Sequence, residues 1–226
     1  AHKAKRKQEK LEAKQKKKAG TEDKVEPRLF VLDFDGDVQA SAVDHLRREI
    51  SAVLQVATQN DEVLVRLQSP GGLVHSYGLA ASQLRRIRNS GIKLTVTVDE
   101  VAASGGYMMA CVADRILAAP FAMLGSIGVI AGIPNLHKVL KKHDIDYEQH
   151  TAGKFKRTLS VLGENTEEGR EKFVADLNVI HGHFRNHVSQ FRPQLDVERV
   201  VGHRCGGKDE PEIDRPRDEH CIIQVE

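Results

Sequence analysis

The sequence predicts an α/β fold in which helices cover a parallel β-sheet. Short apolar runs of strand length alternate with longer segments in which apolar residues recur at helical spacing. This alternation is typical of parallel sheets whose strands are joined by helices. Glycine-rich turns directly follow two of the expected strands, at the edge where such sheets form their sites. With 226 residues, the chain has the length of one domain with an extension.

The expected elements follow one another along the whole middle of the chain. Strands are expected over residues 29–34, 63–67, 92–98, 115–118 and 127–130, the first as a buried strand ending at Gly36. Helices are expected over residues 40–57, at Leu79, Leu84 and Ile87 before Gly91, after Ser104, over 134–143 and over 166–191. The face of the last helix that is expected to be buried carries Phe173, Leu177, Ile180 and Phe184.

The N-terminal end differs from the middle. Residues 1–27 form a basic linker, helical or disordered, with nine lysines or arginines among residues 1–18. Such a tract could bind nucleic acid or an anionic membrane surface. No aromatic residue interleaves its lysines, which argues against binding of single-stranded nucleic acid. The sequence contains no apolar run of transmembrane length, no signal peptide, and no cysteine spacing typical of a disulfide framework or metal site.

Two glycine-rich turns carry the candidate chemistry. Ser104 lies between an expected strand and an expected helix, with Gly105 and Gly106 directly behind it. Its hydroxyl suits a nucleophile, and the N–H groups of Gly105 and of Gly71, in the turn 69–72, suit an oxyanion hole. Because both turns follow strands of a parallel sheet, they should meet on one rim. From the residues alone, Ser104 can equally be a helix N-cap, and the turn 69–72 a simple tight turn.

The residues leave open which group is the base for Ser104. A Gly-x-Ser-x-Gly elbow is absent, because Ala102 stands two positions before Ser104. The chain has 11 histidines, but those in the expected helices have lysine-rich or polar neighbours. A lysine base is chemically possible, because burial and nearby positive charge lower the pKa of an amine. Lys154 and Lys156 are both candidates, and composition cannot choose between them.

Four motifs follow one another in a distinctive order. They are Ser69-Pro70-Gly71-Gly72, Val101-Ala102-Ala103-Ser104-Gly105-Gly106-Tyr107, Gly125-Ser126-Ile127-Gly128-Val129 and Gly153-x-x-Lys156-Arg157. Together they resemble the signal peptide peptidase A family, most closely its SohB branch, over about Arg28 to Val201. The resemblance implies a ClpP/crotonase-like fold, which is an α/β spiral of parallel sheet with covering helices. It also implies a serine protease domain over residues 28–201.

The resemblance further implies a membrane-associated serine endopeptidase with a Ser-Lys dyad and neither metal nor cofactor. By this resemblance Ser104 is the nucleophile, Lys156 the general base, Gly71 and Gly105 the oxyanion donors, and Ser126 a hydroxyl that supports the lysine. The implied substrates are signal-peptide remnants or other membrane-proximal peptides, bound in extended form. Members of the family form homo-oligomeric rings in which neighbouring subunits share each dyad. Ser104 and Lys156 are therefore expected to lie far apart in one chain.

The family also sets expectations for the two ends of the chain. Its members carry an N-terminal anchor in the bacterial inner membrane, which is absent here, and hold the catalytic domain in the periplasm. Nucleic acid is not an expected partner. Residues 202–226 depart from the family pattern, and we hypothesise a reading-frame slip near residue 201 or a foreign, disordered tail.

Two other functions remain compatible with the same fold. A crotonase-like acyl-CoA enzyme would use backbone N–H donors on a thioester and carboxylates as acid and base. A catalytically inactive scaffold would keep only the assembly surface. An activated serine separates the protease from both alternatives.

Overall fold

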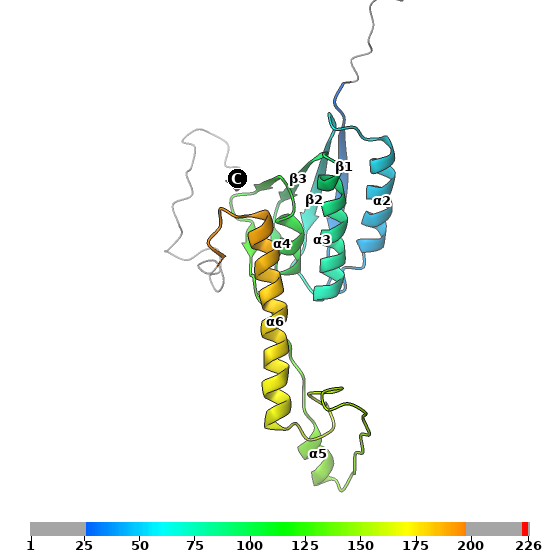
Figure 1. The fold of residues 1–226 in the computed structure, drawn as a ribbon, viewed down its shortest axis with the longest axis vertical. Coiled ribbons are helices and arrows are strands. Elements are labelled where there is room, and N and C mark those ends of the chain that lie inside the picture. Colours follow the sequence, from blue (N-terminus) through cyan, green and yellow to red (C-terminus); the bar gives the residue numbers. More distant parts are fainter. Residues whose placement is uncertain (1–25, 198–222, 226) are drawn as a thin grey trace, which may run out of the picture.

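The computed structural model describes residues 26–197 and 223–225, which form a helix-covered sheet and a long projecting arm (Figure 1). The main sheet has five strands in the order β1-β2-β3-β5-β7. Their bounds are Leu29–Asp35 for β1, Glu62–Gln68 for β2, Lys93–Val98 for β3, Arg115–Ala118 for β5 and Ile223–Val225 for β7. The first four run parallel, and β7 pairs antiparallel with β5. The predicted α/β class with a parallel sheet is confirmed.

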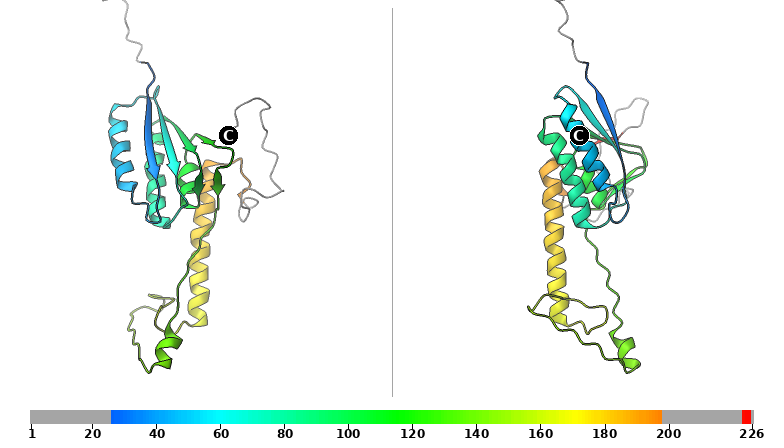
Figure 2. Two further views of the ribbon diagram at one scale, coloured as in Figure 1. Left: turned by 180° about the vertical axis from the view of Figure 1, so that it is seen from behind. Right: turned by 90° about the vertical axis from the view of Figure 1, so that its right-hand side faces the viewer.

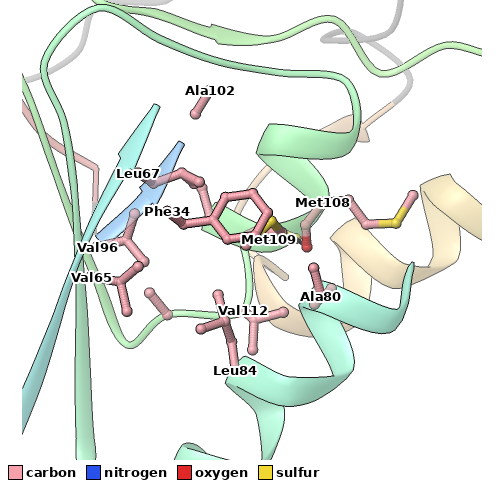
Figure 3. Packing of buried hydrophobic residues seen from close by; sticks show 14 of the residues in the cluster. Phe34, Val65, Leu67, Ala80, Leu84, Val96, Ala102, Met108, Met109 and Val112 are labelled. Atoms are coloured by element: carbon pink, nitrogen blue, oxygen red, sulfur yellow. Dashed lines mark hydrogen bonds between the residues drawn. The ribbon is translucent and has the colours of Figure 1, made fainter. Parts of the chain in front are cut away.

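Three helices lie along one face of this sheet and enclose the core (Figures 1 and 2). They are α2 (Val43–Val56), α3 (Val74–Asn89) and α4 (Gly105–Ala110). Figure 3 shows Phe34, Val65 and Val96 of the strands facing Leu84 of α3 and Met109 of α4. All five side chains are almost completely buried, so hydrophobic burial holds the helices to the sheet.

The other face of the sheet carries both polar and apolar side chains and is exposed along β1. Along β1, Leu32 and Phe34 are buried, whereas Val31 and Asp33 between them are exposed. Arg66 Nε on β2 lies 2.5 Å from Asp33 Oδ1, and such exposed pairs add little stability. The prediction of a buried first strand was therefore wrong for one of its faces, because the described helices cover only the other.

A second, small sheet lies at the carboxyl end of the main one. It pairs β4 (Val101–Ala103) in parallel with β6 (Met123–Gly125). The predicted strand at 127–130 was wrong, because β6 ends at Gly125 and residues 127–130 pair with no strand among the described residues. Ser126, directly after β6, has a φ angle of 55°, which lies outside the extended region that a strand requires.

The arm consists of α5 (His137–Lys142), α6 (Glu167–Phe191) and the segments around them. Figure 2 shows α6 running from the helical layer far out beyond the sheet. Of the predicted buried face, Phe184 is buried, but Phe173, Leu177 and Ile180 remain partly exposed because they lie on the projecting part. Within the described ranges, no helix combines the length and the apolar character needed to cross a membrane.

The predictions for the two ends of the chain fall mostly outside the described residues. The basic linker over 1–27 is described only at its last two positions. Of the atypical tail over 202–226, the structure describes residues 223–225, which form β7.

Asp61 joins the start of β1 to the turn before β2. It accepts hydrogen bonds at 2.7–3.2 Å from the backbone and guanidinium of Arg28 and from the N–H and hydroxyl of Thr58. These bonds, above all those from the Arg28 side chain, hold the pKa of Asp61 far below its ordinary value of 3.8. The charged form therefore stabilises the fold above that value, and this contribution is lost as the pH falls towards the lowered pKa.

Replacing Asp61 by asparagine should lower the free energy of unfolding at pH 7. The difference from the wild type should shrink as the pH falls to about 3, because the wild type then begins to lose the stabilisation from charged Asp61, which the variant lacks at every pH. Urea unfolding at pH 7, 5 and 3 measures this difference. Asp146→Asn, at an exposed position of the arm, is the control. A deficit that stays constant across this pH range would contradict the prediction.

Candidate active site

Ser104 occupies the sharp turn between β4 and α4. Its backbone has φ 50° and ψ −116°, a conformation that costs a residue with a side chain about 1–3 kcal/mol. Its N–H donates to the carbonyl oxygen of Gly125 at 2.8 Å. Its side chain makes no hydrogen bond to the first turn of α4, so Ser104 is not a capping serine. Backbone strain of this kind is concentrated at functional sites.

The turn 69–72 packs directly against Ser104. Gly71 has φ +90°, and a Cβ atom placed on it would lie 2.7 Å from Ser104 Cβ and from the N of Gly105. Only glycine allows this approach and this φ angle. Ser69 joins the turn to β4, because its N–H donates to Val101 O at 2.8 Å and its carbonyl accepts from Ala103 N at 3.0 Å. The prediction that the two glycine-rich turns meet on one rim is confirmed.

Backbone N–H groups of both glycine-rich turns lie close to Ser104. The N–H of Gly105 opens α4 and finds no hydrogen-bond acceptor among the described residues. The Gly71 N–H, by contrast, donates to Ser69 Oγ at 3.1 Å. The N–H of the next residue, Gly72, has no acceptor in the described part of the chain. The turn therefore offers one free donor and one that Ser69 engages.

Ser126 lies next to Ser104 across the small sheet. Ala103 and Gly125 are register partners in β4 and β6, so the two serines occupy neighbouring positions just beyond the strand ends. Ser126 is exposed and, like Ser104, has a positive φ angle. The backbones of the two serines are therefore neighbours, and the supporting role of Ser126 stays a prediction.

Lys156 lies on the arm, in the segment between α5 and α6. Its side chain is exposed. The segment is fastened to the first turn of α6, where Lys154 Nζ contacts Glu168 Oε1 at 2.5 Å. The carbonyl of Thr158 also packs against Gly169 so closely that a Cβ there would collide with it. Lys156 is therefore held near the outer end of α6.

The opposite, C-terminal end of α6 contacts α4, the helix that directly follows Ser104. His187 Nε2 lies 3.0 Å from the carbonyl oxygen of Met108 in α4. At a rise of 1.5 Å per residue, the stretch of α6 from Glu168 to His187 is about 28 Å long. Figure 1 shows the corresponding gap between α4 and the outer tip of the arm. Ser104 and Lys156 are therefore not within hydrogen-bond reach in one chain.

Two other reactive side chains near α4, His187 and Cys111, are not placed to act as base or nucleophile. Burial lowers the pKa of His187, and its ring nitrogen lies against a backbone carbonyl rather than a serine hydroxyl. Burial raises the pKa of Cys111 to about 12, which keeps its thiol protonated. Neither group competes with Ser104 as a nucleophile or supplies it with a base.

Tyr77 was not predicted as a site residue, and Ser69 was predicted only as part of a turn. Both side chains are completely buried, and their hydroxyl oxygens lie 2.6 Å apart. A tyrosine one turn into a helix that follows a glycine-rich turn is the signal that could have found this pair.

Family models match nearly the whole chain. The model described as Peptidase family S49 N-terminal matches residues 1–84, and the model described as Peptidase family S49 matches residues 86–203. The second match includes Ser104, Ser126 and Lys156.

Curated relatives agree with these matches. A sequence from Haemophilus influenzae named "Probable protease SohB" is 60% identical over 188 residues, covering 83% of this chain and 53% of the relative. A sequence of the same name from Buchnera aphidicola of Acyrthosiphon pisum is 60% identical over 173 residues, covering 76% of this chain and 52% of the relative. The chain thus spans about half the length of the curated relatives that it matches. On these matches, the chain belongs to peptidase family S49.

Proposed function

We propose that this chain is a membrane-associated serine endopeptidase in which Ser104 attacks the peptide carbonyl. The observation that carries the proposal is the strained backbone of Ser104 beside free backbone N–H groups. Membership of a peptidase family supports peptide hydrolysis over other reactions of a serine hydroxyl.

The proposed reaction has two steps. Neutral Lys156 takes the proton of Ser104 as Oγ bonds to the carbonyl carbon, and the resulting ammonium then protonates the leaving amine. Water next attacks the acyl-enzyme and releases the acid, which restores Ser104. In both steps the oxyanion is stabilised by the Gly105 N–H and by a donor of the turn 69–72. That donor is Gly71 once it leaves Ser69 Oγ, or Gly72, whose N–H is already free.

The base comes from a neighbouring copy of the chain in this proposal. About 28 Å of α6 separates the segment of Lys156 from the layer of Ser104, so a second arm must reach over. The arm and the chain leading to it carry an unusual number of exposed apolar side chains. They are Ile130, Ile133, Leu136, Val139, Ile145, Phe155, Val174 and Val179. A homo-oligomeric ring would bury them and complete each dyad.

The family resemblance supports a proposal for the substrate class and the place in the cell. We propose that signal-peptide remnants or other membrane-proximal peptides bind in extended form beside Gly71. The exposed side chains of Val38 and Leu73 flank that position, since the Leu73 N–H donates to Val38 O at 2.8 Å. They suit apolar substrate residues. We place the enzyme at the bacterial inner membrane, with its catalytic domain in the periplasm.

A fluorophosphonate probe tests the proposed function. We expect the probe to form one covalent adduct on Ser104 of the whole protein, located by mass spectrometry of the digested adduct. A peptide aldehyde added first should block the labelling. A crotonase-like acyl-CoA enzyme or an inactive scaffold has no activated serine, so the absence of an adduct on Ser104 would contradict the proposal.

A further inference from the structure

A buried chain of hydrogen bonds runs beneath the candidate nucleophile. The Gly71 N–H donates to Ser69 Oγ at 3.1 Å, and Ser69 Oγ lies 2.6 Å from the Tyr77 hydroxyl oxygen. The Tyr77 hydroxyl donates to the carbonyl oxygen of Asp37 at 2.7 Å. Because the tyrosine has one proton and gives it to Asp37, the Ser69 hydroxyl donates to Tyr77. Burial raises the pKa of Tyr77, so its hydroxyl keeps that proton at neutral pH.

These hydrogen bonds connect three segments that are far apart in sequence. Asp37 follows β1, Ser69 and Gly71 follow β2, and Tyr77 lies in α3. Ser69 and Tyr77 are both fully shielded from solvent. A buried hydroxyl that loses its partner is left unsatisfied, which is costly. Each of these hydrogen bonds therefore restricts the orientation of the next group in the series.

Glycines leave just enough room for these two side chains. A Cβ on Gly36 would lie 2.5 Å from both Ser69 Oγ and the Tyr77 hydroxyl oxygen. A Cβ on Gly105, directly after the nucleophile, would collide with the Tyr77 ring. A Cβ on Gly106 would lie 2.6 Å from Ser69 O. The pair is therefore packed against the turn of Ser104 as well as bonded to the turn of Gly71.

We infer that Ser69 and Tyr77 are positioning residues that set the oxyanion hole of Ser104. Ser69 engages the Gly71 N–H, so the free Gly72 N–H is the donor that this turn offers to the oxyanion. The same bond determines how the peptide units of residues 70–72 are rotated. Tyr77 holds Ser69 in the rotamer that does this, and its own bond to Asp37 anchors it. The inference rests on the proposed function, and it assigns a role to two groups that do not touch the substrate.

The test separates transition-state binding from ground-state binding in the whole protein. Acetyl-Leu-Leu-alaninal forms a hemiacetal with an active serine, and its oxygen then needs the oxyanion donors. The alcohol acetyl-Leu-Leu-alaninol has no carbonyl group, so it binds without forming a hemiacetal and places no such oxygen at the oxyanion donors. Ser69→Ala should weaken the aldehyde roughly 100-fold, and Tyr77→Phe about 10-fold, because small shifts of a preorganised donor have effects of this size. The affinity of the alcohol should change little.

A double variant and a matched control complete the design. If Tyr77 acts through Ser69, Ser69→Ala with Tyr77→Phe should weaken the aldehyde no more than Ser69→Ala alone. Thr95→Val removes another buried hydroxyl, which donates to Glu62 Oε1 at 2.6 Å, and should leave both affinities unchanged. Equal weakening of aldehyde and alcohol, or additive effects in the double variant, would overturn the inference. If the wild-type protein binds the aldehyde no more tightly than the alcohol, the proposed function is overturned, and the inference with it.

Discussion

Replacing Ser104 by alanine should lower the rate of peptide hydrolysis by about 10⁴-fold or more, as loss of the nucleophile does in well-studied serine proteases. The rate should fall so far because the described residues offer no second nucleophile in this turn. Burial keeps the Cys111 thiol protonated, and Ser126 lies beside Ser104 but outside the turn that faces Gly71. The measurement is turnover of an internally quenched peptide with apolar residues around the scissile bond.

The control for this variant is Ser82→Ala on α3. Ser82 is exposed, and its hydroxyl bonds only within α3, donating to Leu79 O and accepting from Gln83 Nε2. Its removal should therefore leave turnover within a factor of about two. Circular dichroism and urea unfolding of the Ser104 variant should match the wild type, because alanine removes only the hydroxyl. Hydrolysis that persists in Ser104→Ala at a hundredth of the wild-type rate or more would rule out Ser104 as the nucleophile.

Replacing Lys156 by alanine should lower turnover by roughly 10²–10⁴-fold, the range expected when a general base is lost. Lys154→Ala is the matched control, because Lys154 already pairs with Glu168 at 2.5 Å. Both lysines are exposed on the same segment of the arm, and only the one that reaches a neighbouring Ser104 should matter. A larger loss in Lys154→Ala would assign the base to Lys154 instead.

Mixing the two inactive variants tests whether the dyad is shared. A Lys156→Ala chain supplies Ser104, and a Ser104→Ala chain supplies Lys156, so a site between them is complete. After dissociation and reassembly at equal amounts, about a quarter of the sites in a ring should be complete, and turnover should return to about a quarter of the wild-type value. Each variant alone should stay inactive. No recovery in mixed rings of the correct size would show that the dyad lies within one chain.

Local sequence was sufficient for most elements of the fold. The strand and helix periods predicted β1, α2, β2, α3 and β3 within a few residues, because their buried positions repeat along each element. The strand at 127–130 was predicted wrongly for a local reason. Its apolar residues resemble a strand, but Ser126, with its positive φ angle, follows the end of β6 and precedes them.

The candidate site could be predicted only in part. Motif order pointed to Ser104, Gly71 and Lys156, and the rule for parallel sheets predicted that the first two would meet. No local pattern could predict that Ser69 Oγ engages the Gly71 N–H, or that Tyr77 supports Ser69. Those contacts depend on how α3 packs between the ends of β1 and β2.

The sequence by itself named the candidate residues, through the order of its motifs, and it determined which edge of the sheet presents Ser104, because glycine-rich turns follow the strands there. Only the tertiary structure decided how far Lys156 lies from Ser104. That distance depends on α6, which His187 ties to α4 at its C-terminal end. Arg192, directly after α6, donates to the carbonyl of Ala113, just beyond α4, at 2.8 Å. These contacts join residues 79 positions apart, and α6 runs outward from them towards the segment of Lys156. The outward direction of the arm is therefore a property of packing, which no short stretch of sequence encodes.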